Sequence, residues 1–368
     1  MIYLDNAATS FPKPRSVIKE VTKCLIEYCG NPGRSSHKLA LAAADKIYET
    51  REAIADLLGF EKCENIIFTP NATYGLNLVI KGLICEKCHC IISDLEHNSV
   101  LRPLYKALEK YNGEVSVFDS DKPLDEAVIP LIRDDTKIII STLCSNVTGK
   151  TINLTDLSRI AETYGLHLVI DASQHVGHAR IDLKNIPFTA LCSAGHKGLF
   201  GIQGSAFTII KGNELFDTLT EGGSGIDSFA RSMPILLPER YEAGTLSTPA
   251  IASLNAGIKF IKEVGIDEIE VKLKSLTDQF RCVISEIPLT KLYGAENGIL
   301  SFNIADYPSS YISDMLDKAD IATRSGFHCA PLIHQRLGTS KTGAVRVSLS
   351  YFNTEQDAHK LYKALKSI

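Results

Sequence analysis

The sequence lacks any apolar stretch close to the roughly 20 residues that a membrane-spanning helix needs, which argues against an integral membrane protein. It also lacks clusters of basic residues. Its 39 lysines and arginines are scattered along the chain, and 43 aspartates and glutamates give a formal net charge of −4. This distribution predicts no basic surface that would bind nucleic acid or an anionic membrane. A small anionic substrate agrees better with the scattered basic residues.

We also expect no secretory leader, because patterned residues 1–6 open the sequence. The ten cysteines then suit a reducing compartment that keeps thiols free, so the expected location is the cytoplasm. Low-complexity tracts and internal repeats are absent. A chain of 368 residues with 45% hydrophobic content can bury a large core, and we expect it to form two domains.

Three cysteines lie close together at Cys85, Cys88 and Cys90, and with His89 they suggest a zinc site. Structural zinc usually needs a second pair of ligands at a defined distance, and none follows. Cys88, Cys90 and Ile92 instead alternate as the buried face of a strand does. We therefore predict small buried thiols here and no metal site.

Between about residues 13 and 255, short β-branched runs alternate with longer amphipathic stretches, which is typical of a mostly parallel sheet flanked by helices. Strands are predicted at residues 65–68, 88–93, 114–118, 137–141, 167–171, 190–193 and 206–210. Helices are predicted at residues 36–58, 73–83, 99–111 and 154–164. The predicted fold class is therefore α/β.

From about residue 265 the pattern changes. A long helix is predicted at residues 267–287, strands at 299–303 and 345–350, and a final helix at 354–366. These elements predict a smaller α+β domain at the C-terminal end. We assign residues 13–255 to the large domain, and residues 1–12 and 256–368 to the small one.

An ordered set of polar residues stands out in the large domain. Asp171 closes an apolar run, Gln174 follows it, and Gly195, His196 and Lys197 come next. A lysine amine can condense with an aldehyde cofactor, and a carboxylate can keep a pyridine nitrogen protonated; Lys197 and Asp171 suit these roles. Gln174 could donate to the ring's phenolic oxygen, and His196 could reach a phosphate. Each residue alone has an ordinary explanation, but the set predicts a pyridoxal phosphate site.

Residues 71–75 lie between a predicted strand and a predicted helix. Their backbone amides, including that of Ala72, and the hydroxyl of Thr73 could cradle a phosphate at the helix N-terminus. An ordinary helix cap is the alternative, and it would be preferred for this segment alone. Beside the predicted cofactor lysine, we favour the anion site. Open α/β sheets also bind ligands at strand carboxyl ends, where several of these residues fall.

A second reactive residue is expected at Cys329. It lies in a loop, residues 324–331, that also contains Arg324, His328, glycine and proline. A neighbouring cation lowers the pKa of a thiol and raises the fraction of nucleophilic thiolate. The alternative is a structural cysteine in a turn, but the predicted cofactor supplies an electrophile and so favours the nucleophile.

With these motifs in place, the chain resembles the class V aminotransferase-fold enzymes, and among them the cysteine desulfurases of the NifS and SufS type. The resemblance covers nearly the whole length and implies the type I fold of pyridoxal phosphate-dependent transferases. The compact sequence around Cys329 is closer to the SufS and selenocysteine lyase branch. The matching segments are residues 3–9, 96–97, 145–147, 171–174, 195–197, 242–245, 324–329 and 346–348.

The resemblance implies roles for individual residues. His97 would stack on the pyridine ring and, with Lys197 and Cys329, form the catalytic set. Thr245 would approach the phosphate from the partner subunit of a homodimer. The substrate would be bound by Asn146, Arg346, Arg324 and His328. The cofactor would be bound by Ala72, Thr73, His97, Asn146, Asp171, Gln174, Ser193, His196, Lys197 and Thr245.

Three positions depart from the family pattern. Ala194 stands where the family often has Ser or Thr, and Ser193 lies one place earlier. Gly201 is followed by Ile202 instead of the usual proline. Phe327 replaces the first histidine of a common His-His-Cys-Ala sequence, which would make the mouth of the site more apolar.

The activity implied by the resemblance is the conversion of L-cysteine to L-alanine. Lys197 would move the Cα proton, and Cys329 would take the sulfur as a persulfide and pass it to an acceptor protein. A selenocysteine lyase acting on L-selenocysteine stays open, as does a lyase or epimerase of the same fold. A non-catalytic scaffold is less favoured, because Lys197, Asp171 and Cys329 occur together.

Overall fold

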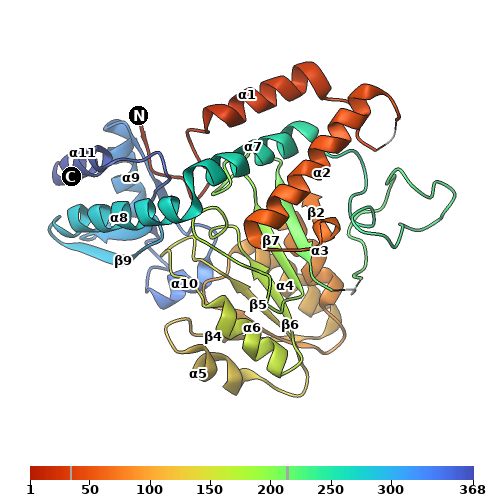
Figure 1. Ribbon diagram of the computed structural model, residues 1–368. Coiled ribbons are helices and arrows are strands. Elements are labelled where there is room, and N and C mark those ends of the chain that lie inside the picture. Colours follow the sequence, from red (N-terminus) through yellow and green to blue (C-terminus); the bar gives the residue numbers. More distant parts are fainter. Residues whose placement is uncertain (34, 213–214) are drawn as a thin grey trace.

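The computed structural model describes residues 1–33, 35–212 and 215–368, and a seven-stranded sheet lies at its centre (Figure 1). The sheet order is β2-β8-β7-β6-β5-β3-β4, and β8 runs antiparallel to both of its neighbours while the other pairs are parallel. The strands are β2 (Ile66–Thr69), β3 (His89–Ser93), β4 (Glu114–Phe118), β5 (Thr136–Thr142), β6 (His167–Asp171), β7 (Ala190–Ala194) and β8 (Ala206–Ile210). The predicted mostly parallel α/β sheet is confirmed, and every predicted strand end lies within one residue of the observed end.

Helices cover both faces of this sheet, because successive strand residues alternate between the faces. Ile67, Cys90 and Ile140 share one buried cluster with α3 and α4, and Ile66 and Ile91 share another with α2, α6 and α7. Both sides of each strand are therefore apolar, as a sheet covered on two faces requires. These helices are α2 (Lys38–Leu58), α3 (Ala72–Leu83), α4 (Asn98–Tyr111), α6 (Leu154–Thr163) and α7 (Thr248–Val264).

The C-terminal part forms a second, antiparallel sheet in the order β12-β13-β10-β9. The N-terminal strand β1 pairs in parallel with β11 beside it, which joins the start of the chain to its C-terminal part. Helices α8 and α9 pack against these strands, and α11 packs against α8 and α9. The elements are β1 (Ile2–Tyr3), α8 (Ile266–Ser285), β9 (Thr290–Glu296), β10 (Ile299–Ile304), α9 (Ser309–Lys318), β11 (Ile321–Ala322), β12 (Arg324–Gly326), α10 (Pro331–Arg336), β13 (Ala344–Ser348) and α11 (Glu355–Lys366).

Helices α1 (Arg15–Lys23) and α7 are not among the helices predicted from the sequence. In the structure, α1 and α2 both pack along α7 at one side of the molecule (Figure 1). The predicted domain boundary between residues 255 and 256 falls inside α7, and the division of the chain into domains stays a prediction. Smaller helical elements are α5 (Leu124–Val128) and the turns Cys24–Tyr28, Cys63–Asn65 and Ile129–Leu131.

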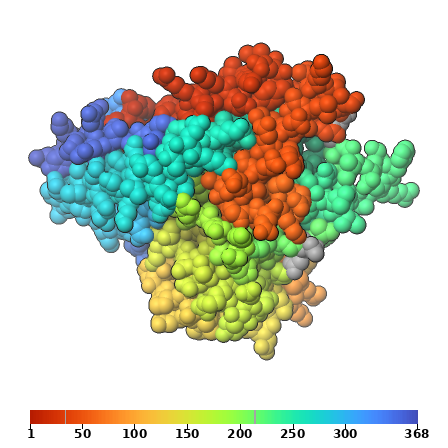
Figure 2. All heavy atoms as spheres, viewed as in Figure 1, coloured from red at the N-terminus to blue at the C-terminus, as the bar shows by residue number. Residues whose placement is uncertain are grey.

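Among the described residues, no helix combines the length and the apolar character that a membrane crossing requires. Residues 215–247 contain no helix or strand, and part of this segment projects from the body of the molecule (Figure 1; Figure 2). The parallel strands all end at one edge of the large sheet. Segments that follow them there carry most of the polar residues that the sequence analysis selected.

Candidate active site

A cavity of about 230 Å³ lies at this edge of the large sheet, and residues of the second sheet close it. It brings together residues that are up to 339 positions apart, from Ala7 to Arg346. The sequence-predicted residues that line it are Ala72, Thr73, His97, Asn146, Asp171, Gln174, His196, Lys197, Arg324, His328 and Arg346. Three others, Ser193, Thr245 and Cys329, are not among the lining residues.

Lys197 follows β7, and Asp171 ends the neighbouring strand β6. Burial lowers the pKa of Lys197 to about 8, and the guanidinium groups of Arg346 and Arg324 act in the same direction against the negative charge of Asp171. One oxygen of Asp171, Oδ1, accepts a hydrogen bond from the backbone N–H of Ser173 at 3.0 Å. The site therefore holds a fixed carboxylate and an amine that loses its proton more easily than an ordinary lysine.

His97 is the N-cap of α4, and its Nδ1 accepts from the backbone N–H of Ser99 at 3.0 Å. Burial, followed by the positive charge of Lys197, lowers the pKa of His97 to about 4. The imidazole is therefore neutral near pH 7, and because Nδ1 is an acceptor, the ring proton sits on Nε2. A neutral, fixed ring suits stacking against a flat aromatic group.

The N-terminus of α3 is capped by Asn71, whose Oδ1 accepts from the backbone N–H of Tyr74 at 2.9 Å. The capping role considered for Thr73 is thus filled by another residue. The Thr73 hydroxyl instead lies 2.7 Å from that of Ser99, which is itself 2.9 Å from His97 Nδ1. Because the first amides of a helix have no acceptor within the helix, this corner can bind an anion.

The backbone around His196 is held by the N-terminal segment. The carbonyl oxygen of His196 accepts from the N–H of Ser10 at 3.1 Å, from Thr9 Oγ1 at 3.1 Å and from Lys13 Nζ at 3.0 Å. Lys13 is not among the site residues predicted from the sequence. These bonds fix the peptide that precedes Lys197, and so they fix the start of the lysine side chain.

Buried polar atoms without a protein partner remain in the cavity. His196 Nδ1, Gln174 Oε1 and Arg346 Nε are each fully buried and unbonded among the described residues. Burial also lowers the pKa of His196 to about 4, so its ring is neutral near pH 7. Gln174 Nε2 donates one hydrogen to the carbonyl of Ala7 at 2.9 Å. Unpaired buried polar atoms are costly, so their presence is evidence that the cavity is shaped for a polar ligand.

Arg346 lies in β13, and its side chain is only 1% exposed. Its Nη2 donates to Asp5 Oδ1 at 2.6 Å, and its Nη1 donates to the carbonyl of Asn146 at 3.0 Å. Burial lowers the pKa of Arg346, and Asp5 opposes that effect. Asp5 was not selected as a site residue, although it lies in a matched segment. A substrate carboxylate at this guanidinium would have to share it with Asp5.

Cys329 lies outside the cavity, in an exposed position next to His328, which lines it. Both residues have left-handed backbone conformations, with φ of 50° at His328 and 57° at Cys329. The carbonyl of Cys329 accepts from the N–H of Asn98 at 2.7 Å, which ties the loop to the residue after His97. Left-handed φ is unfavourable for these residue types, so the loop presents Cys329 under backbone strain.

His328 cannot be the cation that was expected to activate Cys329. Burial is the largest cause of a strongly lowered pKa of His328, and the charges of Arg346 and Arg324 add to it. The imidazole is therefore neutral near pH 7. Arg324 is therefore the residue of this loop that can supply a positive charge near Cys329.

Ser193 and Thr245 do not reach the cavity in this chain. Strand alternation turns Ala194 toward the cavity, whereas the hydroxyl of Ser193 is buried elsewhere without a partner among the described residues. Thr245 is exposed in the irregular segment 215–247. A contribution of Thr245 to a partner's site stays a prediction.

Two further predictions concern Phe327 and the cysteine cluster. The side chain of Phe327 is 48% exposed, and its ring contacts that of His334 edge-on, so it adds an apolar surface beside Cys329. Cys88 and Cys90 are buried as expected, but the expectation was wrong for Cys85, which is exposed because it lies in the turn before β3. Within the described residues, no group of three or more His, Cys, Asp or Glu could hold a metal ion.

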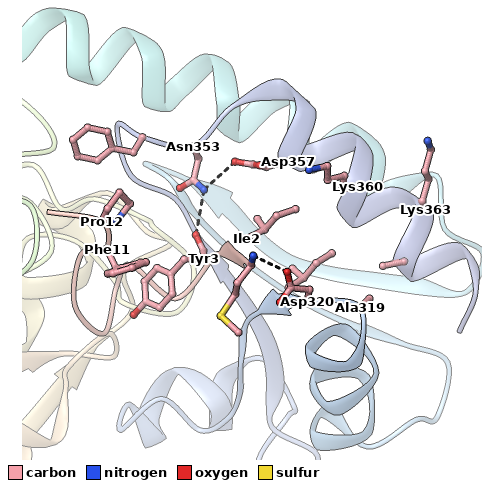
Figure 3. Close-up of a pocket in the computed structure, with 14 residues that line it drawn as sticks. Ile2, Tyr3, Phe11, Pro12, Ala319, Asp320, Asn353, Asp357, Lys360 and Lys363 are labelled. Carbon is pink, nitrogen blue, oxygen red and sulfur yellow. Dashed lines mark hydrogen bonds and ion pairs between the residues drawn. The ribbon is translucent and has the colours of Figure 1, made fainter. Parts of the chain in front are cut away.

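A larger cavity of about 660 Å³ lies between β1 and α11 (Figure 3). The Met1 amino group is paired there with Asp320 Oδ2 at 2.6 Å. Asn353 bridges the carbonyl of Tyr3 and the carboxylate of Asp357 (Figure 3). None of the sequence-predicted site residues lines this cavity, so the expected chemistry belongs to the smaller one.

Comparisons with known proteins agree with this arrangement. A family model described as aminotransferase class V matches residues 2–361. A probable cysteine desulfurase of Methanothermobacter thermautotrophicus is 31% identical over 381 residues, covering 100% of this chain and 94% of the relative. A probable cysteine desulfurase of Pyrococcus abyssi is also 31% identical, with coverage of 100% and 94%.

Among solved structures, the apo structure of a cysteine desulfurase from Thermococcus onnurineus NA1 is similar to this chain with a TM-score of 0.90. The two are 27% identical, and the match covers 100% of this chain and 94% of the other. The parallel sheet, the lysine at its carboxyl edge and the full-length matches therefore lead to one conclusion: this chain belongs to the aminotransferase class V family.

Proposed function

We propose that this chain is a pyridoxal phosphate-dependent cysteine desulfurase that converts L-cysteine to L-alanine and transfers the sulfur to Cys329. The observation that carries the proposal is the setting of Lys197, a buried amine whose pKa is lowered to about 8, in one cavity with Asp171 and with unpaired polar atoms. The names of the relatives favour this activity over the selenocysteine lyase, eliminating lyase and scaffold alternatives. The closer likeness to the SufS branch stays a prediction.

The residues present fit the cofactor. Lys197 would hold its aldehyde carbon, and Asp171 would face its pyridine nitrogen. The neutral ring of His97 would lie against the pyridine face. Thr73, the first amides of α3 and the unpaired Nδ1 of His196 would hold the phosphate, for which helix N-termini and N–H donors are suited.

When bound, pyridoxal phosphate supplies a protonated ring that withdraws electrons from the substrate Cα. The protein's own groups supply the remaining functions. Arg346 and Asn146 would hold the substrate carboxylate, with Arg324 and His328 beside them. The Lys197 amine would move the Cα proton as a general base and then as an acid, since its pKa is close to neutral pH.

Cys329 would accept the sulfur at the mouth of the cavity. A bond forms between Cys329 Sγ and the substrate sulfur as the bond between that sulfur and the substrate Cβ breaks, and the Cβ then takes a proton. The overall balance is L-cysteine plus the Cys329 thiol giving L-alanine plus the Cys329 persulfide. Its exposure would let a thiol of an acceptor protein collect the outer sulfur.

We also propose a homodimer located in the cytoplasm. Exposed apolar side chains gather on α1, α2 and the segments beside them, which is the kind of surface that a second subunit covers. They are Ile18, Leu25, Ile26, Leu39, Leu41 and Tyr48. Thr245, exposed and away from its own cavity, is consistent with a site completed by a partner.

Mass analysis tests the proposed function directly. The cofactor-loaded protein is incubated with L-cysteine and without a reductant, and its peptides are then mapped while alanine is measured. We expect one added sulfur on Cys329 and one alanine for each modified chain. Pyruvate in place of alanine, or sulfur mapped to other cysteines only, would refute the proposal.

A further inference from the structure

A second set of thiols lies at the opposite end of the large sheet from the candidate active site. Cys85 and Cys88 flank the turn that joins α3 to β3, and Cys88 directly precedes the first residue of β3. The active-site segment that contains His97 follows the other end of this strand. Five strand residues span roughly 17 Å, so these thiols are remote from the chemistry proposed above.

The backbone already holds Cys85 and Cys88 close to each other. The N–H of Cys88 donates to the carbonyl of Cys85 at 3.4 Å, which closes a four-residue turn, and Lys87 has a φ of 56° within it. The ends of such a turn lie within about 7 Å of each other between Cα atoms. Disulfides join Cα atoms about 4.4–6.8 Å apart, so a bond between these residues needs little backbone movement.

The two thiols differ in access. Cys85 is exposed, whereas Cys88 is only 2% exposed and its Sγ lies against Gly113, where an added Cβ would be 3.7 Å away. The backbone of Cys88 is fixed as well, because its carbonyl accepts from the N–H of Glu114 at 3.0 Å. A dissolved reagent can therefore reach Cys85, but it cannot readily reach Cys88.

The two thiols also differ in charge. The pKa of Cys88 is lowered to about 6, and the largest cause is a hydrogen bond from the Cys90 thiol. Hydrogen bonds from the Cys85 thiol and from nearby backbone amides lower it further, whereas burial raises it. The pKa of Cys90 is raised, so Cys90 keeps its proton. Burial and the charge of Cys88 raise the pKa of Cys85. Near pH 7, Cys88 is thus a buried thiolate held next to an exposed thiol.

We propose that Cys85 and Cys88 form a dithiol–disulfide exchange site for low-molecular-weight disulfides. The thiolate form of Cys85 attacks a disulfide R–S–S–R, so that a bond forms between Cys85 and one sulfur and the other leaves as RS⁻. Cys88 then attacks the Cys85 sulfur, which forms the Cys85–Cys88 disulfide and releases a second RS⁻. The two protein thiols lose two electrons and two protons, and the oxidant becomes two molecules of thiol, RSH.

This site is independent of the proposed desulfurase activity. It uses neither Lys197 nor Cys329, and its products are visible in the mass of the turn peptide alone. It also differs from a zinc site, because the described residues contain no suitable metal-ligand group.

Oxidation with glutathione disulfide tests the proposal. The cofactor-loaded protein is treated with the reagent, its remaining thiols are blocked by alkylation, and its peptides are mapped by mass. In the wild type we expect a loss of two hydrogens and a linkage between Cys85 and Cys88. In Cys88→Ser we expect glutathione to stay attached to Cys85, at a level about tenfold or more above the wild type.

Cys282→Ser is the matched control, because Cys282 is exposed but lies in α8, outside the turn. This variant should form the Cys85–Cys88 linkage as the wild type does. The proposal is overturned if wild-type Cys85 retains glutathione as fully as the Cys88→Ser variant does. It is also overturned if the linkage maps to Cys88 and Cys90, or if Cys85 stays free while Cys282 reacts. The other outcomes are read from the wild-type peptide map alone, so a Cys85–Cys88 linkage or its absence there decides the proposal even where Cys88→Ser does not fold.

Discussion

The two proposed reactive residues, Lys197 and Cys329, have opposite settings. Lys197 follows a buried strand, and the carbonyl before it is held by Thr9, Ser10 and Lys13. Cys329 is exposed in a loop with two consecutive left-handed residues. A residue that holds a cofactor needs a fixed position and an altered pKa, whereas a residue that hands sulfur to another protein needs access.

Replacing Lys197 by alanine should abolish the function of the fixed residue of this pair. The change removes both the amine that holds the cofactor and the base at the substrate Cα, so we expect alanine formation to fall by about 10³-fold or more. The visible absorbance of the bound cofactor should be lost as well. Lys184→Ala, at an exposed lysine in the segment between β6 and β7, is the control and should keep both. Substantial alanine formation by Lys197→Ala would contradict the assignment.

Replacing Cys329 by serine should abolish sulfur transfer to the exposed residue and leave cofactor binding intact. The serine hydroxyl is a poor acceptor of sulfur, so we expect alanine formation from cysteine to fall by about 10²-fold or more. The cofactor absorbance should be unchanged, because Cys329 does not line the cavity. Steady-state assays and absorbance spectra of this variant beside Cys282→Ser test the prediction. Full retained turnover would make Cys329 incidental.

The burial of Lys197 predicts a particular pH dependence. Only the neutral amine can attack the cofactor aldehyde, and burial lowers the pKa of this amine from 10.5 to about 8. The rate at which the cofactor-free protein binds added pyridoxal phosphate should therefore rise about tenfold between pH 7 and pH 9 and then level off. Stopped-flow absorbance measures this rate. A rate that still rises about eightfold between pH 9 and pH 10 would show a lysine with an ordinary pKa.

Substitutions of Lys13 test whether the hydrogen bonds to the carbonyl of His196 are needed to position Lys197. Lys13→Met removes the bond from Nζ to the His196 carbonyl and the bond to Ser10 Oγ at 2.7 Å. Because Lys13 is only half-buried, we expect kcat to fall by about three- to tenfold with a small change in KM. Lys13→Arg, which keeps a donor and the charge, should recover part of the loss. If Lys13→Met behaves as the wild type does, the N-terminal segment does not position Lys197.

The smallest expected effect concerns Ser193, which was predicted to bind the cofactor. Its hydroxyl is fully buried and has no partner among the described residues, so Ser193→Ala should raise the free energy of unfolding by about 1 kcal/mol. Cofactor affinity should not change, because Ala194 and not Ser193 lines the cavity. Urea unfolding and cofactor titration measure the two quantities. A weakened cofactor affinity would support the predicted contact between Ser193 and the cofactor.

Local sequence patterns predicted the parts of the molecule that depend on nearby residues. The β-branched runs of β3, β5 and β6 are continuous and apolar, as strands covered on both faces must be, and the polar residues after them fall at the carboxyl edge. His97, Asp171 and Lys197 could therefore be selected from the sequence.

Contacts across long distances in the sequence could not be predicted in this way. Lys13 meets the carbonyl of His196, which is 183 positions away, and Asp5 meets Arg346, which is 341 positions away. Neither has a local pattern that distinguishes it from an exposed charge. The neutral state of His328 likewise comes mainly from burial by the tertiary structure, which the local sequence does not show.

The central claim is that the buried lysine at the edge of the sheet holds the cofactor. Borohydride reduction of the cofactor-loaded protein, followed by peptide mapping, tests it most directly, because reduction makes the bond between cofactor and lysine permanent. The account predicts a pyridoxyl group on Lys197. Labelling of Lys13, whose pKa is also lowered to about 8, or of no lysine at all would contradict it.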